Sequence, residues 1–179
     1  MKKLVLIICL AVVWKAYSQQ SKPQSGTVIP EFGKTFIVEN PDFKTNTDTV
    51  FNVVFDVYKA PQDPSQLNKT VETLARFLNM HKKAGVPVQN MNVRMALHGP
   101  AAYGVLNDEY YEAQFGVKNP NIKLFEALDK AGVAIILCGQ TAHSRNITQE
   151  RRLPLTQVAL SAMTVLIQSQ EEGYQLISF

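Results

Sequence analysis

The sequence predicts an α/β fold with three layers, in which a mostly parallel sheet of four to five strands lies between helices on both faces. Short apolar segments rich in β-branched and aromatic residues alternate with amphipathic segments of about ten or more residues, several of which end at a glycine. Strands and helices that alternate in this way form βαβ units, which build a parallel sheet covered on both faces.

The first strand and the first helix lie in the N-terminal half of the chain. Residues 49–58 are nearly continuously apolar, which suits a strand buried on both faces. The helix that follows is expected to end at Ala84 and Gly85, with Pro87 just beyond. Its inner face is formed by four apolar residues at helical spacing: Leu67, Val71, Leu74 and Leu78.

The middle of the chain is predicted to add two further strands. Residues 91–97 form the first of these, which stops at His98, and residues 133–137 form the second, which runs directly into Cys138. A helix over residues 121–130, closed by a glycine, connects the two strands. The two strands therefore end in reactive side chains.

The C-terminal part is predicted to contain one long helix and a last strand. The helix is expected to run from Pro154 to Glu172, because proline is preorganised for a first helical turn. A narrow polar stripe should follow this otherwise apolar helix: Gln157, Ser161, Thr164 and Gln168. Gly173 ends the helix, and residues 174–179 form the strand.

Residues 1–18 have the composition of a secretory signal peptide. Lys2 and Lys3 precede an apolar run, and small residues up to Ser18 suit cleavage before Gln19. The apolar run has about ten residues, whereas a membrane-spanning helix needs roughly twenty, so a cleaved leader is favoured over a retained anchor. We therefore expect a periplasmic or secreted protein with no membrane association after cleavage.

The mature chain divides into an arm and a single domain. Residues 19–47 are rich in Gln, Ser, Pro, Gly and Thr and predict an extended arm, with one short strand over residues 34–38. Residues 48–179 form the α/β domain, and about 160 residues in all are enough for one core.

The charge of the mature chain is expected to be nearly balanced. The whole sequence has 18 basic and 15 acidic residues and a pI of about 8.8, but Lys2, Lys3 and Lys15 are removed with the leader. Balanced charge without a basic cluster gives no reason to expect nucleic acid as a partner.

The carboxyl ends of two predicted strands are candidate sites for chemistry. In an open parallel sheet, sites form where the strands end and the chain turns into the next helix. His98 and Gly99 follow one strand, and Cys138, Gly139 and Gln140 follow its neighbour in the chain. Each glycine allows a sharp turn and a close approach to a ligand.

Cys138, the single cysteine of the mature chain, has two possible interpretations. A lone cysteine at the end of an apolar strand is often a small buried hydrophobic residue. At a strand tip, however, loop amides and the N-terminus of a following helix favour the thiolate, which is the nucleophilic form. Arg145 or His143, in the following loop, could add positive charge.

The placing of the histidines and the absence of common motifs exclude several classes of site. His98 either lines a site or packs against a loop carbonyl, whereas His81 and His143 are interpreted as structural or solvated. The histidines and the cysteine have no zinc-type spacing, and the common glycine motifs of nucleotide-binding proteins and serine hydrolases are absent from the sequence. We therefore expect neither a metal nor a cofactor.

Residues 29–179 resemble the DsrE/DsrF-like family of sulfur metabolism, and in particular its exported branch. The order and spacing of several segments carry this resemblance: Val54-Phe55-Asp56-Val57, residues 76–81, Leu97-His98-Gly99-Pro100, Asn119-Pro120-Asn121, residues 128–133, Cys138-Gly139-Gln140, residues 160–164 and residues 170–174.

The resemblance implies a site and an assembly. It implies that the strands bearing His98 and Cys138 are neighbours, and that the protein forms homo-oligomers, often built from trimers, with the cysteine near a subunit interface. In family members that relay sulfur, the matching cysteine carries sulfane sulfur as a persulfide. Cys138 would then be the nucleophile, Gly139 and Gln140 would donate hydrogen bonds to the persulfide, and His98, Gly99 and Asn79 would line the pocket.

Two functions are favoured on this basis, and a purely structural module is the remaining alternative. The first is a sulfur carrier or sulfurtransferase that exchanges sulfur with a small donor or acceptor through Cys138. The alternative is a non-catalytic oligomeric binding protein for a small thiol or sulfur-containing ligand.

Overall fold

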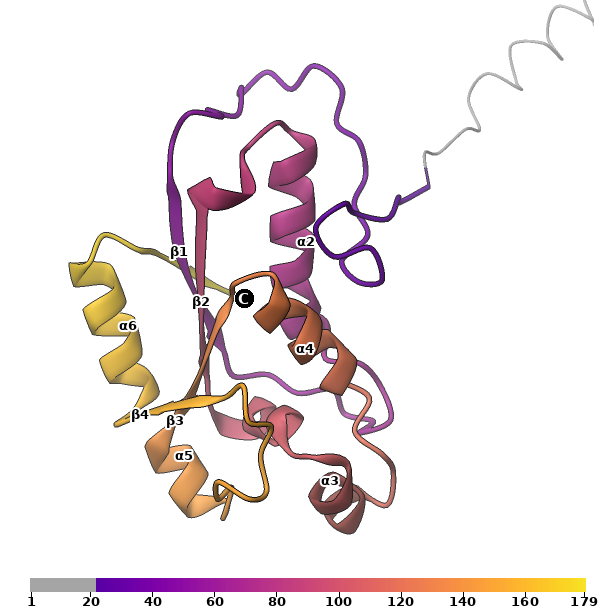
Figure 1. Ribbon diagram of the computed structural model, residues 1–179, viewed down its shortest axis with the longest axis vertical. Helices are drawn as coiled ribbons and strands as arrows, with labels where there is room; N and C mark the ends of the chain where they lie inside the picture. Colours follow the sequence, from indigo (N-terminus) through magenta and orange to yellow (C-terminus); the bar gives the residue numbers. More distant parts are fainter. Residues whose placement is uncertain (1–21) are drawn as a thin grey trace, which may run out of the picture.

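The computed structural model describes residues 22–179, so the leader predicted for residues 1–18 lies outside the described residues. Five parallel strands form one sheet in the order β4-β3-β2-β1-β5. The strands are β1 (Phe51–Val57), β2 (Met91–Leu97), β3 (Ala134–Cys138), β4 (Gln157–Ala159) and β5 (Gln175–Ser178). The predicted fold class, a parallel sheet with helices on both faces, is confirmed (Figure 1).

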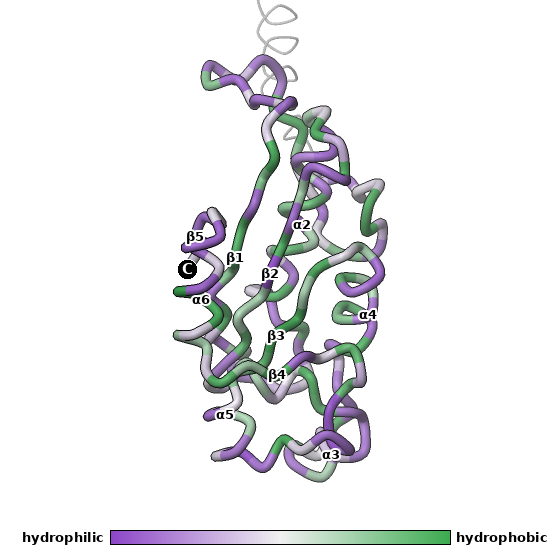
Figure 2. The backbone as a smooth tube through the Cα atoms, turned by 60° about the vertical axis from the view of Figure 1, so that its left-hand side comes forward, coloured by the Kyte–Doolittle hydropathy of each residue, from purple (hydrophilic) through white to green (hydrophobic). Residues whose placement is uncertain are grey.

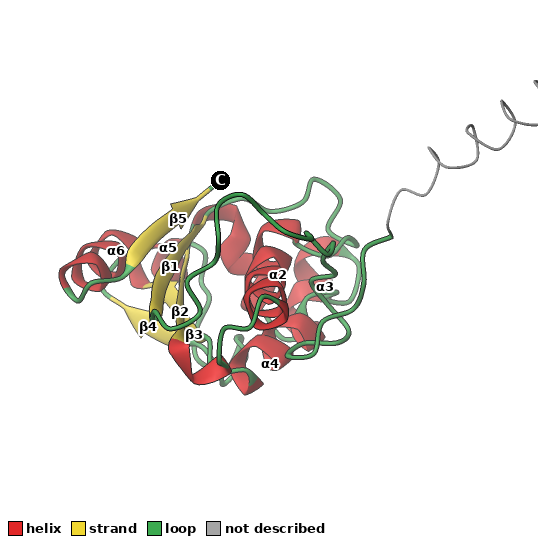
Figure 3. Cartoon of the chain, turned by 90° about the horizontal axis from the view of Figure 1, so that it is seen from above, coloured by secondary structure: helices red, strands yellow, loops and turns green. Residues whose placement is uncertain are grey.

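Helices cover both faces of the sheet, as the view from above shows (Figure 3). α2 (Lys69–Lys83) and α4 (Ile122–Lys130) lie on one face, and α6 (Ala162–Glu171) lies on the other. The main core is formed between the sheet and the helices α2 and α4, and a smaller cluster around Val54, Ala96 and Val165 lies under α6. Hydrophobic segments accordingly run along the central strands (Figure 2).

The first βαβ unit follows from local sequence signals. The side chain of Asn68 accepts hydrogen bonds from the amides of Thr70 and Val71, which satisfies two of the free donors at the start of α2. Gly85, at φ +102°, turns the chain after the last helical turn. β1 and β2 then pair in register from Phe51 and Met91 to Val57 and Leu97.

The long helix predicted for residues 154–172 is wrong in its first half. Residues 157–159 form β4, which pairs with β3 at the edge of the sheet, and α6 begins only at Ala162. Ser161 is not part of a polar stripe but the N-cap of α6, because its hydroxyl accepts the amide hydrogen of Thr164 at 3.1 Å. Pro154 precedes the strand instead of starting the helix.

Some short elements were not predicted. They are the helices α3 (Asp108–Phe115) and α5 (Gly139–Ser144) and the 3-10 turns η1 (Val88–Asn90) and η2 (Gly99–Val105). The strand predicted for residues 34–38 is reduced to a single antiparallel bridge between Thr35 and Gln24.

No helix within residues 22–179 is long and apolar enough to cross a membrane.

Candidate functional site

The tips of β2 and β3 lie side by side, as expected from the resemblance. Leu97 and Leu137 are the last paired residues of the two strands, so His98 and Cys138 occupy neighbouring positions at the carboxyl edge of the sheet. Neighbouring strands lie about 4.8 Å apart, which brings both residues to one site. Figure 1 shows α5 and the start of α6 at this same edge of the sheet.

The sulfur of Cys138 lies among hydrogen-bond donors at the start of two helices. Cys138 is 6% exposed and forms no disulfide within residues 22–179. Burial raises the pKa of its thiol, but the Thr141 hydroxyl and the backbone amides of Thr141, Ala162 and Gln140 donate hydrogen bonds that lower it by more. The pKa of Cys138 therefore lies below that of an ordinary thiol, which favours the nucleophilic thiolate.

Gly139 allows this arrangement through close packing. A Cβ atom at this position would lie 2.5 Å from the carbonyl oxygen of Ala159 on β4, which is too close for any side chain. The edge strand therefore passes directly over the start of α5. The same approach brings the segment before α6, and with it the Ala162 amide, to the sulfur.

The two parts of Gln140 have different partners. Its backbone amide lies among the donors to Cys138. Its side chain instead donates to the carbonyl of Leu160 at 3.3 Å, and so ties α5 to the segment before α6. The side chain is thus engaged with the scaffold in this structure.

Gly99 and Thr141 connect the tips of the two strands. The Gly99 amide donates to the Thr141 hydroxyl oxygen at 3.3 Å, which leaves the hydroxyl hydrogen free to point to Cys138. Gly99 has φ +56°, and a Cβ atom there would lie 2.3 Å from the ring of Tyr58. Both the backbone conformation and the space therefore require glycine.

His98 is held by a carboxylate and an aromatic ring. Its Nε2 lies 2.7 Å from Oδ1 of Asp56 on β1, and its ring centre lies 5.3 Å from that of Tyr58. The side chains of His98 and Asp56 are 25% and 29% exposed, so both remain accessible to a small molecule.

Sequence reasoning missed three contributors to this site: Asp56, Thr141 and Ala162. Ala162 was missed because the predicted helix ran through residues 154–172, which hid the true N-terminus of α6. Asp56 carried a signal, since it is a carboxylate within the apolar strand β1, two residues after the fully buried Val54.

Asn79, which was expected in the same pocket, is engaged elsewhere. It is fully buried on α2, where its side-chain oxygen accepts from the amides of Val28 and Ile29. Its side-chain nitrogen donates to the carbonyls of Ile29, Phe32 and Gly33. Asn79 thus anchors the N-terminal arm to α2, and the structure does not bring its side chain to Cys138.

The other two histidines lie outside the site. His81 Nδ1 lies 2.9 Å from the Phe77 carbonyl, and its ring packs against Phe51 and Phe77, while His143 is exposed on α5. Within residues 22–179, no three His, Cys, Asp or Glu side chains gather in a way that could hold a metal ion.

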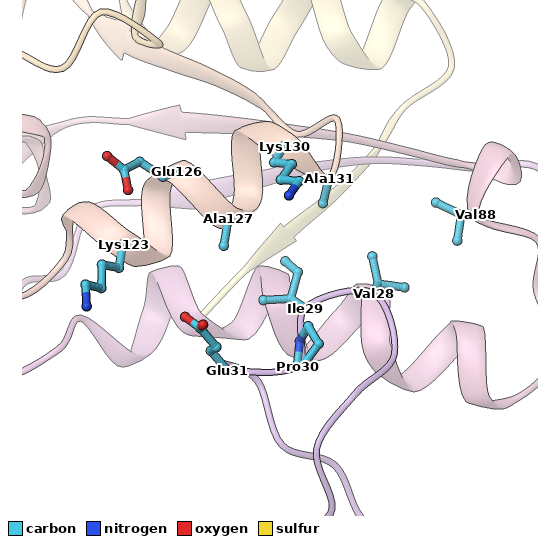
Figure 4. Close-up of a pocket in the computed structure, with 10 residues that line it drawn as sticks. All are labelled: Val28, Ile29, Pro30, Glu31, Val88, Lys123, Glu126, Ala127, Lys130 and Ala131. Carbon is cyan, nitrogen blue, oxygen red and sulfur yellow. The ribbon is translucent and has the colours of Figure 1, made fainter.

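The arm, α4 and Val88 of η1 line a groove of about 690 Å³ (Figure 4). Lys123, Glu126 and Lys130 of α4 and Glu31 of the arm provide its charges, which balance each other. Its remaining lining is apolar side chains and one proline. Since neither Cys138 nor His98 is among its lining residues, this groove is not part of the candidate site.

Comparison with known proteins supports the interpretation of the fold. Residues 52–179 match the model of the DsrE/DsrF-like family. A solved structure of a protein of unknown function from Methanobacterium thermoautotrophicum is similar over 72% of this chain and 99% of its own, with a TM-score of 0.53 and 12% identity. This likeness concerns the fold alone. No curated protein matches the chain significantly.

Proposed function

The chain belongs to the DsrE/DsrF-like family, and on this premise we propose that it is a sulfur carrier or sulfurtransferase that bears sulfane sulfur on Cys138 as a persulfide. The proposal rests on one observation: four hydrogen-bond donors, one hydroxyl and three amides, lie around the sulfur of Cys138. Such donors stabilise an anionic sulfur, which is the form needed both before and after transfer.

The first step of the transfer is an attack by the Cys138 sulfur. The Cys138 thiolate attacks a sulfane sulfur of the donor, a new S–S bond forms, and the bond between that sulfur and the donor breaks. The persulfide then extends the cysteine by one sulfur atom beyond the buried Sγ. This extension is useful here because Cys138 itself is only 6% exposed, and the outer sulfur of a persulfide reaches further toward an acceptor.

The same burial favours the second candidate function. If the Cys138 thiol stays covered, a small sulfur-containing ligand can bind beside it without exchanging sulfur, as in a non-catalytic binding protein. The difference between the two functions lies in whether Cys138 gains a sulfur atom.

The proposal includes a homo-oligomer, built from trimers, with the site near its interface. Leu160, Met163 and Ile167 expose 72%, 70% and 56% of their surface, and they lie beside or on α6. Because the Ala162 amide reaches Cys138, this exposed apolar face adjoins the site. Exposed apolar side chains grouped on one helix are typical of a protein interface.

The proposal places the protein in the periplasm or outside the cell, because of the leader predicted for residues 1–18. The mature N-terminus should then be Gln19, which mass mapping of the exported protein decides. Recovery of intact Met1 from the exported fraction would contradict this placement.

The function is tested by the mass of the purified mature protein after mixing with polysulfide or thiosulfate. A carrier gains one sulfur atom at Cys138, the gain is reversed by a thiol reductant, and Cys138→Ser abolishes it. A protein that binds the donor without a gain in mass is the binding protein of the alternative. A Cys138 thiol that reacts with iodoacetamide only after denaturation rules out the carrier.

A further inference from the structure

Three neighbouring strands place Asp56, His98 and Cys138 on one face of the sheet. Val54, Ala96 and Ile136, which belong to β1, β2 and β3, all contact the small core under α6. Side chains alternate along a strand, so residues two positions further point to the same face. Asp56, His98 and Cys138 are those residues, and they lie where the three strands end.

The central residue of this row, His98, is connected to one neighbour only. Its Nε2 hydrogen bonds with the Asp56 carboxylate at 2.7 Å. Among the described residues, Nδ1 of His98 has no hydrogen-bond partner, and the Tyr58 ring covers one side of the imidazole. A carboxylate that accepts from one ring nitrogen fixes the orientation of the ring and leaves the other nitrogen for a ligand.

We infer that His98 is a catalytic acid that protonates the departing thiolate of the sulfur donor, that Asp56 positions it, and that the donor is a small persulfide or polysulfide. This inference rests on the proposed function. In the step, Cys138–S⁻ attacks the outer sulfur of R–S–SH and forms Cys138–S–SH. The S–S bond of the donor breaks, R–S⁻ leaves, and the proton of the His98 imidazolium converts it into R–SH. No electron is gained or lost overall.

The class of donor follows from the proton that His98 supplies to the leaving group. An alkyl thiolate is a basic leaving group, with an ordinary pKa of about 8.5, and therefore gains from an acid at the moment it leaves. Thiosulfate would instead release sulfite, which leaves as a stable anion without a proton.

The test measures how the reaction of Cys138 depends on the leaving group. The mature protein and its His98→Gln variant react with a series of symmetrical disulfides whose thiols range from acidic aromatic to basic alkyl thiols. Iodoacetamide serves as the reference, since iodide needs no proton. The His143→Gln variant is the matched control, because His143 is exposed on α5, and the histidine that bonds to Asp56 is His98.

The ratio of wild-type to His98→Gln rate should be near one for iodoacetamide and for aromatic disulfides, and should rise to roughly a hundredfold for alkyl disulfides, as general acid catalysis contributes. The ratio of wild-type to Asp56→Asn rate should also rise toward alkyl disulfides, but by less. Asp56→Glu keeps a carboxylate, so its rate with alkyl disulfides should lie between those of the wild type and Asp56→Asn. If His98 only packs against the loop or only stabilises the thiolate, its replacement changes the rates with all reagents of the series by the same factor. A constant ratio across the series therefore overturns the inference.

Sulfur loading, measured separately by mass, distinguishes failure of the inference from failure of the proposed function. Wild-type protein that loads faster from a small polysulfide than from thiosulfate supports the donor class, and the opposite order overturns it. Wild-type protein that never gains sulfur refutes the carrier, whatever the leaving-group series shows. Normal loading together with a constant ratio refutes only the role of His98.

Discussion

The amide of Gly99 and the hydroxyl of Thr141 form a hydrogen bond of 3.3 Å that joins the tip of β2 to the helix after β3. The bond fixes the orientation of the hydroxyl, whose hydrogen is then available to the sulfur of Cys138. A threonine that received no such bond would spend part of its time with the hydroxyl turned away. Gly99 therefore favours the thiolate of Cys138 indirectly, through the hydroxyl of Thr141.

Thr141→Val should make Cys138 less reactive at neutral pH. Valine keeps the shape of threonine but cannot donate to the sulfur, so the pKa of Cys138 should rise toward that of an ordinary thiol. A hydrogen bond to a charged group contributes roughly 1.5–3 kcal/mol, which predicts alkylation by iodoacetamide about tenfold slower at neutral pH. The rate is measured as a function of pH. Thr141→Ser is the control, because it keeps the hydroxyl, and equal rates for all three proteins would contradict the role of Thr141.

The lowered pKa of Cys138 also predicts how stability depends on pH. Donors that favour the thiolate in the folded state stabilise the fold above the pKa of the unfolded thiol, about 8.5, and this stabilisation is lost as the pH falls through the folded-state pKa. The free energy of unfolding of the wild type, minus that of Cys138→Ala, should thus increase with pH up to about 8.5. Urea titrations under reducing conditions measure both. A difference that falls with pH would show that the thiol is neutral in the folded state.

The positions of the central strands along the chain were predictable because their signals are strong and local. β2 occupies the predicted residues, and β1 and β3 lie within one or two residues of their predicted ends. All three are apolar over most of their length, and glycine follows closely after β2 and directly after β3. The position of Cys138 at a strand tip followed directly from this pattern.

The elements at the carboxyl edge were less predictable, because they depend on tertiary contacts. β4 has only three residues and exists by pairing with β3, while its own side chains are mostly exposed. A helical interpretation of residues 154–172 was therefore locally reasonable, yet it hid the Ser161 cap and the Ala162 amide. Asn79 was misplaced for a similar reason, since its partners lie about fifty positions away in an arm without regular structure.

Asn79→Ala should release the arm without changing the chemistry of Cys138. The side chain makes five hydrogen bonds with residues 28–33, and its loss leaves buried amides without partners. Each buried group that loses its partner costs about 1–3 kcal/mol, so the free energy of unfolding should fall by several kcal/mol.

Limited proteolysis of Asn79→Ala should then cut within the arm, while the alkylation rate of Cys138 stays at the wild-type value. A large change in that rate would place Asn79 in the site after all. Asn92→Ala is the control, since its amide bonds only to Asn52 in an exposed position.

Gly139→Ala should destabilise the protein, against the ordinary preference of helices for alanine. At the first residue of a helix, alanine would normally be neutral or better than glycine by up to about 1 kcal/mol. Here the added Cβ would lie 2.5 Å from the Ala159 carbonyl, and a backbone atom in an edge strand moves only if β4 shifts. A cost of about 1–3 kcal/mol is expected, together with slower alkylation, because the Ala162 amide moves with β4. Urea unfolding measures the cost, and a more stable variant would contradict the close packing.

Met163→Lys and Ile167→Lys should dissociate the proposed homo-oligomer. The two side chains lie one helical turn apart on α6 and expose 70% and 56% of their surface, so each can be replaced with little effect on the isolated fold. In an oligomer that buries them, each contributes roughly 1.5–3 kcal/mol per copy, and an unpaired lysine in their place adds a desolvation cost. Sedimentation velocity should therefore give a larger species for the wild type and a monomer for either variant.

Gln114→Lys is the control, because Gln114 is exposed on α3, outside the face that carries Met163 and Ile167. If the oligomer also shields Cys138, iodoacetamide should react faster with the two α6 variants than with the control, which connects the assembly to the site. A wild-type protein that sediments as a monomer at micromolar concentration would show that this apolar face has another partner or none.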